Sequence, residues 1–201
     1  MPHLLCAVAS LTIDPSKSAL VLIDLQQGIV GRQLAPRSGA EVVLNASRLA
    51  ARFRALGSTV VLVRVAFQPD LKDFLKAPAD APQQFNPGAL PPSWSELVPE
   101  LGQQPADLVI TKRQWGAFHG TELDLQLRRR DVRTIVFGGI STNIGVESTA
   151  RSAYEHGYSQ VFAEDAMTSH SAEAHEFAVR NIFPRIGNVR STGDVLSALA
   201  Q

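Results

Sequence analysis

Residues 134–146 read TIVFGGISTNIGV, and this stretch sets the interpretation of the whole sequence. It opens as a short apolar run typical of a buried strand and passes through turn and capping residues into a helix expected from about 143 to 156. The same alternation recurs along the chain. Further strands are expected at 19–23, 59–65, 108–111, 160–163 and 186–190, and further helices at 41–56, 121–130 and 172–183, before a short terminal helix capped by Ser191 and Thr192. This order predicts an α/β fold of three α/β/α layers with a mostly parallel sheet of about six strands.

The composition is that of an ordinary globular protein. The 201 residues suit a single domain spanning 1–201, and 45% hydrophobic content is too apolar for a disordered chain. Lysine plus arginine and aspartate plus glutamate number 19 each, so the basic excess typical of nucleic-acid binding is missing and no nucleic-acid partner is expected. Because Cys6 is the sole cysteine, no intrachain disulfide can form, and the cytoplasm is the expected location.

Two segments are expected to lie outside the regular alternation. Residues 1–17 are interpreted as an N-terminal tail, since their apolar start is too short to span a membrane and has no basic residues before it. Residues 66–106 are broken by prolines and are interpreted as a long loop that covers the site, because loops of this length are usually functional.

Reactive residues follow three of the predicted strands. Ligands of open α/β sheets bind beyond the carboxyl ends of the strands, where Asp24, Lys112 and the turn 139–145 are expected. Asp24 and Lys112 are natural partners because an unpaired buried charge is costly, although the pair could also be purely structural. Backbone N–H groups at the helix start could hold an anion, and an ordinary capped helix is the alternative. Neither a dinucleotide fingerprint nor a phosphate-binding loop motif is present.

Taken together, three ordered segments resemble the isochorismatase-like (cysteine hydrolase) superfamily. They are VLIDLQ at 21–26, KRQWGAF at 112–118 and GISTNIGVESTAR at 139–151, and the third is similar to an uncharacterised bacterial subgroup. The resemblance runs from about residue 18 to the C-terminus and implies a Rossmann-like sheet. It also implies a homodimer or homotetramer, a small-molecule substrate, and often a cis peptide near 140–141.

The resemblance assigns roles by position. Asp24 matches the family's acid/base, Lys112 its lysine, and Gly145 the position of its catalytic cysteine. Glycine cannot form the thioester of a cysteine amidase. Phenazine-pathway isochorismatases are similar in having a small residue there: an aspartic acid protonates an enol-ether carbon, and water adds to the resulting oxocarbenium ion. An adjacent ammonium would lower the pKa of Asp24, whereas burial would raise it, and the sequence leaves this balance open.

The remaining site calls concern binding. The expected substrate-binding residues are Gln26, Trp115, Phe118, Ser141, Thr142 and Asn143. Trp115 and Phe118 could instead be core packing, and Thr142 and Asn143 could simply cap their helix. The histidines show no ligand spacing, so no metal and no cofactor is expected, and His119 is the one placed beside the presumed site.

Three functional hypotheses follow. The first is a hydrolase of a small polar or carboxylated molecule that works without a covalent cysteine intermediate. The second is a catalytically silent binding or assembly protein that has lost its nucleophile. The third is a cysteine-like activity supplied by another residue.

Overall fold

A central parallel sheet organises the computed structural model, which describes residues 11–82, 86 and 90–199. In this part of the chain the sheet has six strands in the order β3-β2-β1-β4-β5-β6, and every neighbouring pair is parallel. The strands are β1 (Ser18–Ile23), β2 (Thr59–Val65), β3 (Leu108–Lys112), β4 (Thr134–Ile140), β5 (Ser159–Thr168) and β6 (Asn188–Arg190). The chain order reverses between β1 and β4, and a crevice forms at such a switch point.

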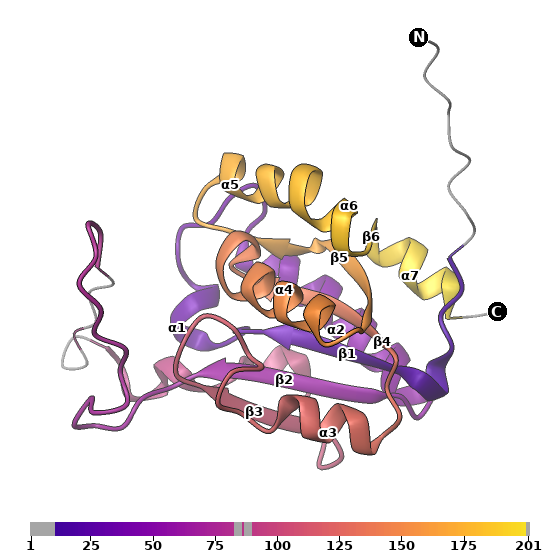
Figure 1. Cartoon of the computed structure of the whole chain (residues 1–201), viewed down its shortest axis with the longest axis horizontal. Coiled ribbons are helices and arrows are strands. Elements are labelled where there is room, and N and C mark those ends of the chain that lie inside the picture. Colours follow the sequence, from indigo (N-terminus) through magenta and orange to yellow (C-terminus); the bar gives the residue numbers. More distant parts are fainter. Residues whose placement is uncertain (1–10, 83–85, 87–89, 200–201) are drawn as a thin grey trace, which may run out of the picture.

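Helices cover both faces of the sheet, which confirms the predicted three-layer architecture (Figure 1). Strand β1 shows why: Leu20 and Leu22 face the core under α2, whereas Val21 and Ile23 face the core under α3 and α4. The helices are α1 (Gln27–Val30), α2 (Gly39–Ala55), α3 (Leu123–Arg129), α4 (Glu147–Glu155), α5 (Ala172–Phe177), α6 (Phe183–Ile186) and α7 (Thr192–Ala198).

Several element boundaries differ from those expected. Strand β5 runs five residues past the predicted end at 163, because Met167 and Thr168 pair with the end of β4 beyond a shift in register. The helix expected from 143 begins as the π-helical turn η5 (Thr142–Val146) before α4. A second π-helical turn, η6 (Ala178–Ile182), divides α5 from α6. Helix α1 was not predicted at all.

The long segment after β2 has two parts. Residues 66–82 project away from the sheet, at the left of Figure 1. Residues 92–101 return to it through the 3-10 turns η3 (Pro92–Ser95) and η4 (Pro99–Leu101), and a bridge joins Leu97 to Gln26. The second part therefore holds α1 in place.

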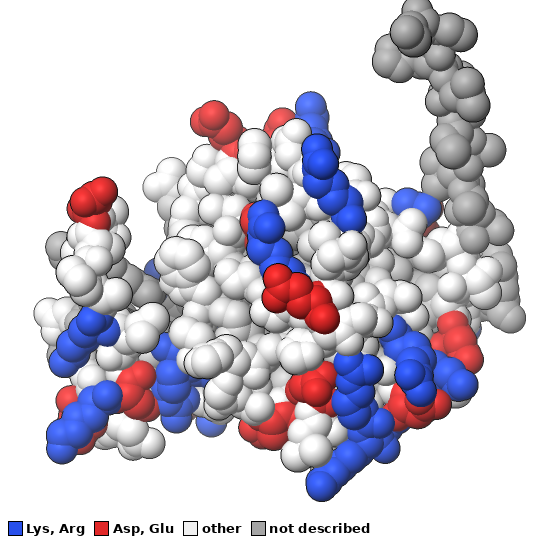
Figure 2. All heavy atoms as spheres, viewed as in Figure 1, with Lys and Arg blue, Asp and Glu red and all other residues white. Residues whose placement is uncertain are grey.

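The first described residues pack against the core on the α2 face. Ile13 is buried against the α2 face, while Cys6 and the other residues of 1–10 lie outside the described residues. None of the described helices has both the length and the apolar character needed to cross a membrane. Acidic and basic side chains are intermixed on the face shown in Figure 2.

Candidate active site

Asp24 and Lys112 form a buried ion pair at the carboxyl edge of the sheet. Asp24 directly follows β1, and Lys112 is the last residue of β3. Since β2 lies between these strands, the lysine side chain crosses it to place Nζ 2.8 Å from Asp24 Oδ2. Nζ also donates to the Trp115 carbonyl over 2.6 Å. Asp24 is 6% exposed and Lys112 2%, so water screens the pair little.

The backbone aims the Asp24 carboxylate. Asp24 has φ 53°, in the left-handed region that aspartate tolerates better than most residues, and its N–H donates to the Val63 carbonyl. Oδ2 faces Lys112, while Oδ1 is buried and has no hydrogen-bond partner among the described residues. Burial raises the pKa of Asp24, and this effect outweighs the nearby Lys112 charge, which lowers it. The carboxyl group can therefore hold a proton more readily than an ordinary aspartate.

Gly145 leaves space beside this pair. It lies in η5, and a Cβ on it would stand 3.2 Å from both Asp24 Oδ2 and Lys112 Nζ. The turn is held close to β1 by Gly139, whose φ is 123° and where a Cβ would come 2.1 Å from the Ile23 carbonyl oxygen. Only glycine permits that approach. The Ile140–Ser141 peptide between them is cis.

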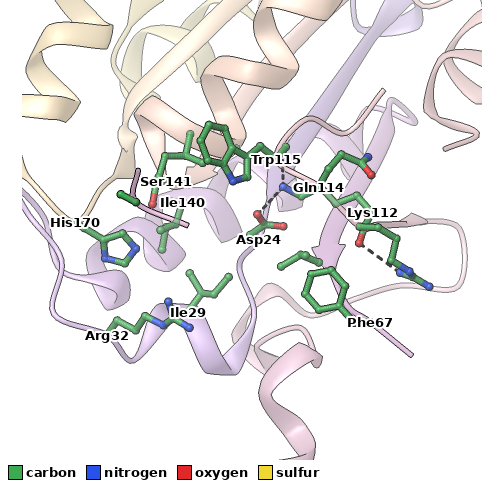
Figure 3. Close-up of a pocket in the computed structure, with 15 residues that line it drawn as sticks. Asp24, Ile29, Arg32, Phe67, Lys112, Gln114, Trp115, Ile140, Ser141 and His170 are labelled. Carbon is green, nitrogen blue, oxygen red and sulfur yellow. Dashed lines mark hydrogen bonds and ion pairs between the residues drawn. The ribbon is translucent and has the colours of Figure 1, made fainter. Parts of the chain in front are cut away.

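A cavity of about 250 Å³ opens over the ion pair (Figure 3). Three cationic side chains and one carboxylate contribute to its wall, next to aliphatic and aromatic groups. Its lining residues are Asp24, Ile29, Arg32, Val65, Phe67, Ala81, Lys112, Arg113, Gln114, Trp115, Ile140, Ser141, Ile144, Gly145 and His170. The size and polarity suit a small polar or charged molecule.

Five of the residues expected from the sequence meet at this cavity, and four lie elsewhere. Asp24, Lys112, Gly145, Ser141 and Trp115 line it, and Trp115 is 56% exposed. Gln26, Phe118, Thr142 and Asn143 are not among its lining residues.

Each of those four has a structural contact. The Gln26 amide donates to the carbonyls of Val65 and Trp94 and accepts from the Val65 N–H, tying the end of β1 to the long segment. Phe118 packs against the rings of Tyr158 and His156. Thr142 donates to the Thr168 carbonyl and contacts His175 Nδ1, while Asn143 Oδ1 accepts from Ser169.

Sequence reasoning missed Arg32, Phe67, Arg113, Gln114 and His170 at the cavity. His170 could have been found by the rule that selected Asp24, because it follows β5 closely once the true end of that strand at Thr168 is known. Arg32 gives no such signal, since it follows an unpredicted helix. His119, which was singled out instead, is exposed and does not line the cavity. Among the described residues, no group of three histidine, cysteine, aspartate or glutamate side chains could hold a metal ion.

Comparisons of the sequence give a consistent assignment. Residues 18–194 match the isochorismatase domain. The chain is 53% identical over 187 residues to the isochorismatase family protein YwoC of Bacillus subtilis, covering 93% of this chain and 96% of the relative. It is 31% identical over 215 residues to the ureidoacrylate amidohydrolase RutB of Cronobacter sakazakii, covering 94% and 92% respectively.

Solved structures agree. An isochorismatase family protein of Burkholderia thailandensis superposes with a TM-score of 0.90 at 48% identity, over 96% of this chain and all of the other. N-carbamoylsarcosine amidase of Thermoplasma acidophilum superposes with a TM-score of 0.69 at 25% identity, over 88% of this chain and 96% of the other.

Proposed function

The chain belongs to the isochorismatase family of hydrolases, and we propose that it hydrolyses a small polar or carboxylated molecule without a covalent intermediate on the protein. One observation carries the proposal: the Asp24–Lys112 pair is buried under a cavity, and the residue beside it, Gly145, has no nucleophilic side chain. By resemblance, Gly145 stands where the cysteine hydrolases of this superfamily have their cysteine.

Asp24 acts as the general acid and then as the general base. A raised pKa favours the protonated carboxyl, and the unpartnered Oδ1 is the oxygen that Lys112 leaves free. With an enol ether, Asp24 gives its proton to the vinyl carbon, forming a C–H bond and an oxocarbenium ion. Water adds to that cation and returns a proton to Asp24, and the hemiketal collapses with cleavage of its C–O bond.

Lys112 and the helix start supply the electrostatics. The Lys112 ammonium stabilises the Asp24 carboxylate that forms once the proton has left. The turn 141–145 leads into η5, where backbone N–H groups can bind an anionic substrate oxygen. The Ile144 N–H is not one of them, because it donates to the Ser141 carbonyl. The proposal assigns no metal or cofactor.

The relatives' names support a carboxylated substrate. Ureidoacrylate and N-carbamoylsarcosine, the compounds named for two relatives, are both small carboxylates. The cavity of about 250 Å³, with cations in its wall, suits molecules of that size and charge.

The test is turnover of a panel of amides, esters and enol ethers by wild type, Asp24→Asn and Lys112→Met. We expect wild type to hydrolyse at least one compound and Asp24→Asn to lose about a hundredfold or more of that rate, as for removal of a general acid. Each variant leaves one buried group unpaired, so its folding is checked by thermal denaturation. Equal turnover by wild type and Asp24→Asn would contradict the mechanism.

A second candidate, a catalytically silent binding protein, is favoured by the missing side chain at Gly145 alone. Both candidates bind ligands in the same cavity. A wild type that turns over nothing in the panel but is stabilised by a panel compound in a thermal shift assay supports this second function.

A further inference from the structure

Arg32 differs from the other cations of the cavity, because no ion pair joins it to a carboxylate of the residues that the structure describes. Lys112 is paired with Asp24 at 2.8 Å, and Arg113 with Asp73 at 2.5 Å. Within the described part of the chain, no carboxylate oxygen lies within 4.0 Å of the Arg32 guanidinium. Among the described residues, Arg32 is therefore a cation of the cavity without a carboxylate partner.

Arg32 is an exposed side chain at the rim of the cavity, with one hydrogen bond to the main chain. Its Nε donates to the Gly28 carbonyl over 2.8 Å, while its terminal nitrogens donate to no acceptor among the described residues. The preceding turn packs against the segment that contains Trp94 and Glu96. A Cβ on Gly28 would stand 2.8 Å from Trp94 Cβ, and the Gln27 N–H donates to the Glu96 carbonyl. The side chain is thus anchored at Nε with its two terminal amino groups left over.

Arg32 and Asp24 line the same cavity. In Figure 3 Arg32 and His170 lie on one side of Asp24, and Gln114 lies on the other. The apolar side chains of Ile29 and Ile140 belong to the same wall as Arg32 and Asp24. A bound molecule can therefore have an anionic group at Arg32 and a reacting bond at the Asp24 carboxyl, with an apolar stretch between them.

We propose that Arg32 binds a carboxylate of the substrate and makes this site selective for small carboxylates over their neutral counterparts. This inference rests on the proposed function for the direction of the reacting bond, but the binding itself does not require turnover. The planar guanidinium presents paired donors that match a carboxylate, and such charge-assisted hydrogen bonds are stronger than neutral ones.

The experiment is isothermal titration calorimetry with 3-ureidoacrylate, N-carbamoylsarcosine and benzoate, each beside its primary amide, and with inorganic phosphate. The variants are Arg32→Gln and Arg32→Lys. Arg48→Gln is the matched control, because Arg48 is exposed like Arg32 but lies on α2 outside the cavity lining. Each protein is measured at low and high sodium chloride.

We expect wild type and Arg48→Gln to bind at least one carboxylate saturably. The affinity for its amide should be lower by at least about tenfold, as for loss of a charge-assisted hydrogen bond. Arg32→Gln should erase this preference, Arg32→Lys should keep part of it, and salt should weaken only the Arg32-dependent binding.

The inference is overturned if none of the carboxylates binds saturably, or if acid and amide bind equally. It is also overturned if phosphate binds more tightly than the carboxylates, or if Arg32→Gln keeps the preference for the acid. A carboxylate preference that needs Arg32 in a protein without turnover would overturn the proposed function and leave this inference standing. Equal turnover of charged and neutral substrates would overturn this inference and leave the proposed function standing.

Discussion

A side chain at Gly145 would enter the cavity beside the Asp24–Lys112 ion pair. Its Cβ would lie 3.0 Å from Ile23 Cγ2 and 3.2 Å from both charged atoms of the ion pair, so these neighbours would have to give by a few tenths of an ångström. A thiol there would stand beside the Lys112 ammonium, which favours the thiolate. A cysteine placed at this position would therefore have a cation beside its thiol.

Gly145→Cys in a Cys6→Ser background should create an acylable thiol. The thiolate attacks the carbonyl carbon of p-nitrophenyl acetate, p-nitrophenolate leaves, and a thioester remains on the protein. We expect a burst at least about tenfold faster than that of Ser148→Cys, because a lysine lowers the pKa of a nearby thiol. Ser148 lies on α4 and is not among the cavity-lining residues.

Mass spectrometry detects the acetyl adduct, and absorbance follows the released nitrophenolate. Equal burst rates for the Gly145→Cys and Ser148→Cys proteins would show that the ion pair does not activate a group at this position.

At the scale of elements, the contact between β1 and β4 determines where the site lies. Gly139 pairs with Ile23, and these two residues bring the end of β4 against the end of β1, directly before Asp24. The turn η5 follows immediately and places Gly145 over the ion pair. The geometry of the site therefore depends on the absence of a side chain at Gly139.

Gly139→Ala should lower the free energy of unfolding by about 3 kcal/mol, the upper part of the range for overpacking, because its Cβ would meet the Ile23 backbone. Gly57→Ala is the matched control: Gly57 has φ 70°, but its Cβ would meet nothing within 4 Å. It should cost only about 1 kcal/mol for the left-handed backbone conformation. Urea denaturation measures both, and equal losses would contradict the close approach.

The elements also show what the sequence could and could not predict. The sequence pattern located each of the six strands that the structure describes, and the strand-end rule selected Asp24 and Lys112. It failed at His170, since Glu164 and Asp165 interrupt the apolar run although the backbone pairing of β5 continues past them. The place of Arg32 at the cavity could not be predicted from the sequence. Arg32 follows α1, and α1 depends on contacts with residues 94–97, which lie in a segment without periodicity.

At the scale of the whole molecule, the parallel order of the sheet assembles the site from distant segments. Asp24 follows β1, Lys112 ends β3 and Gly145 lies in the turn after β4, and all three meet at the carboxyl edge beside the switch point. Charge is balanced over the chain, with 19 basic and 19 acidic residues, whereas the cavity wall is locally cationic. Assembly into a homodimer or homotetramer stays a prediction.

This arrangement has a consequence for pH dependence. Because the folded protein raises the pKa of Asp24 above its ordinary value of 3.8, the native state binds this proton more tightly than the unfolded chain does. The resulting contribution to stability is present at low pH and is lost as the pH rises through the folded-state pKa. Hydrolysis that uses Asp24 as an acid should decline over the same window.

The most direct measurement of the central claim is the titration of the Asp24 side-chain carbon by NMR in protein labelled with ¹³C-aspartate, assigned by loss of the signal in Asp24→Asn. We predict a midpoint above 3.8, moving higher in Lys112→Met because the ammonium opposes the effect of burial. A midpoint at or below 3.8 would mean that Lys112 keeps Asp24 ionised, and the carboxyl could not serve as the general acid.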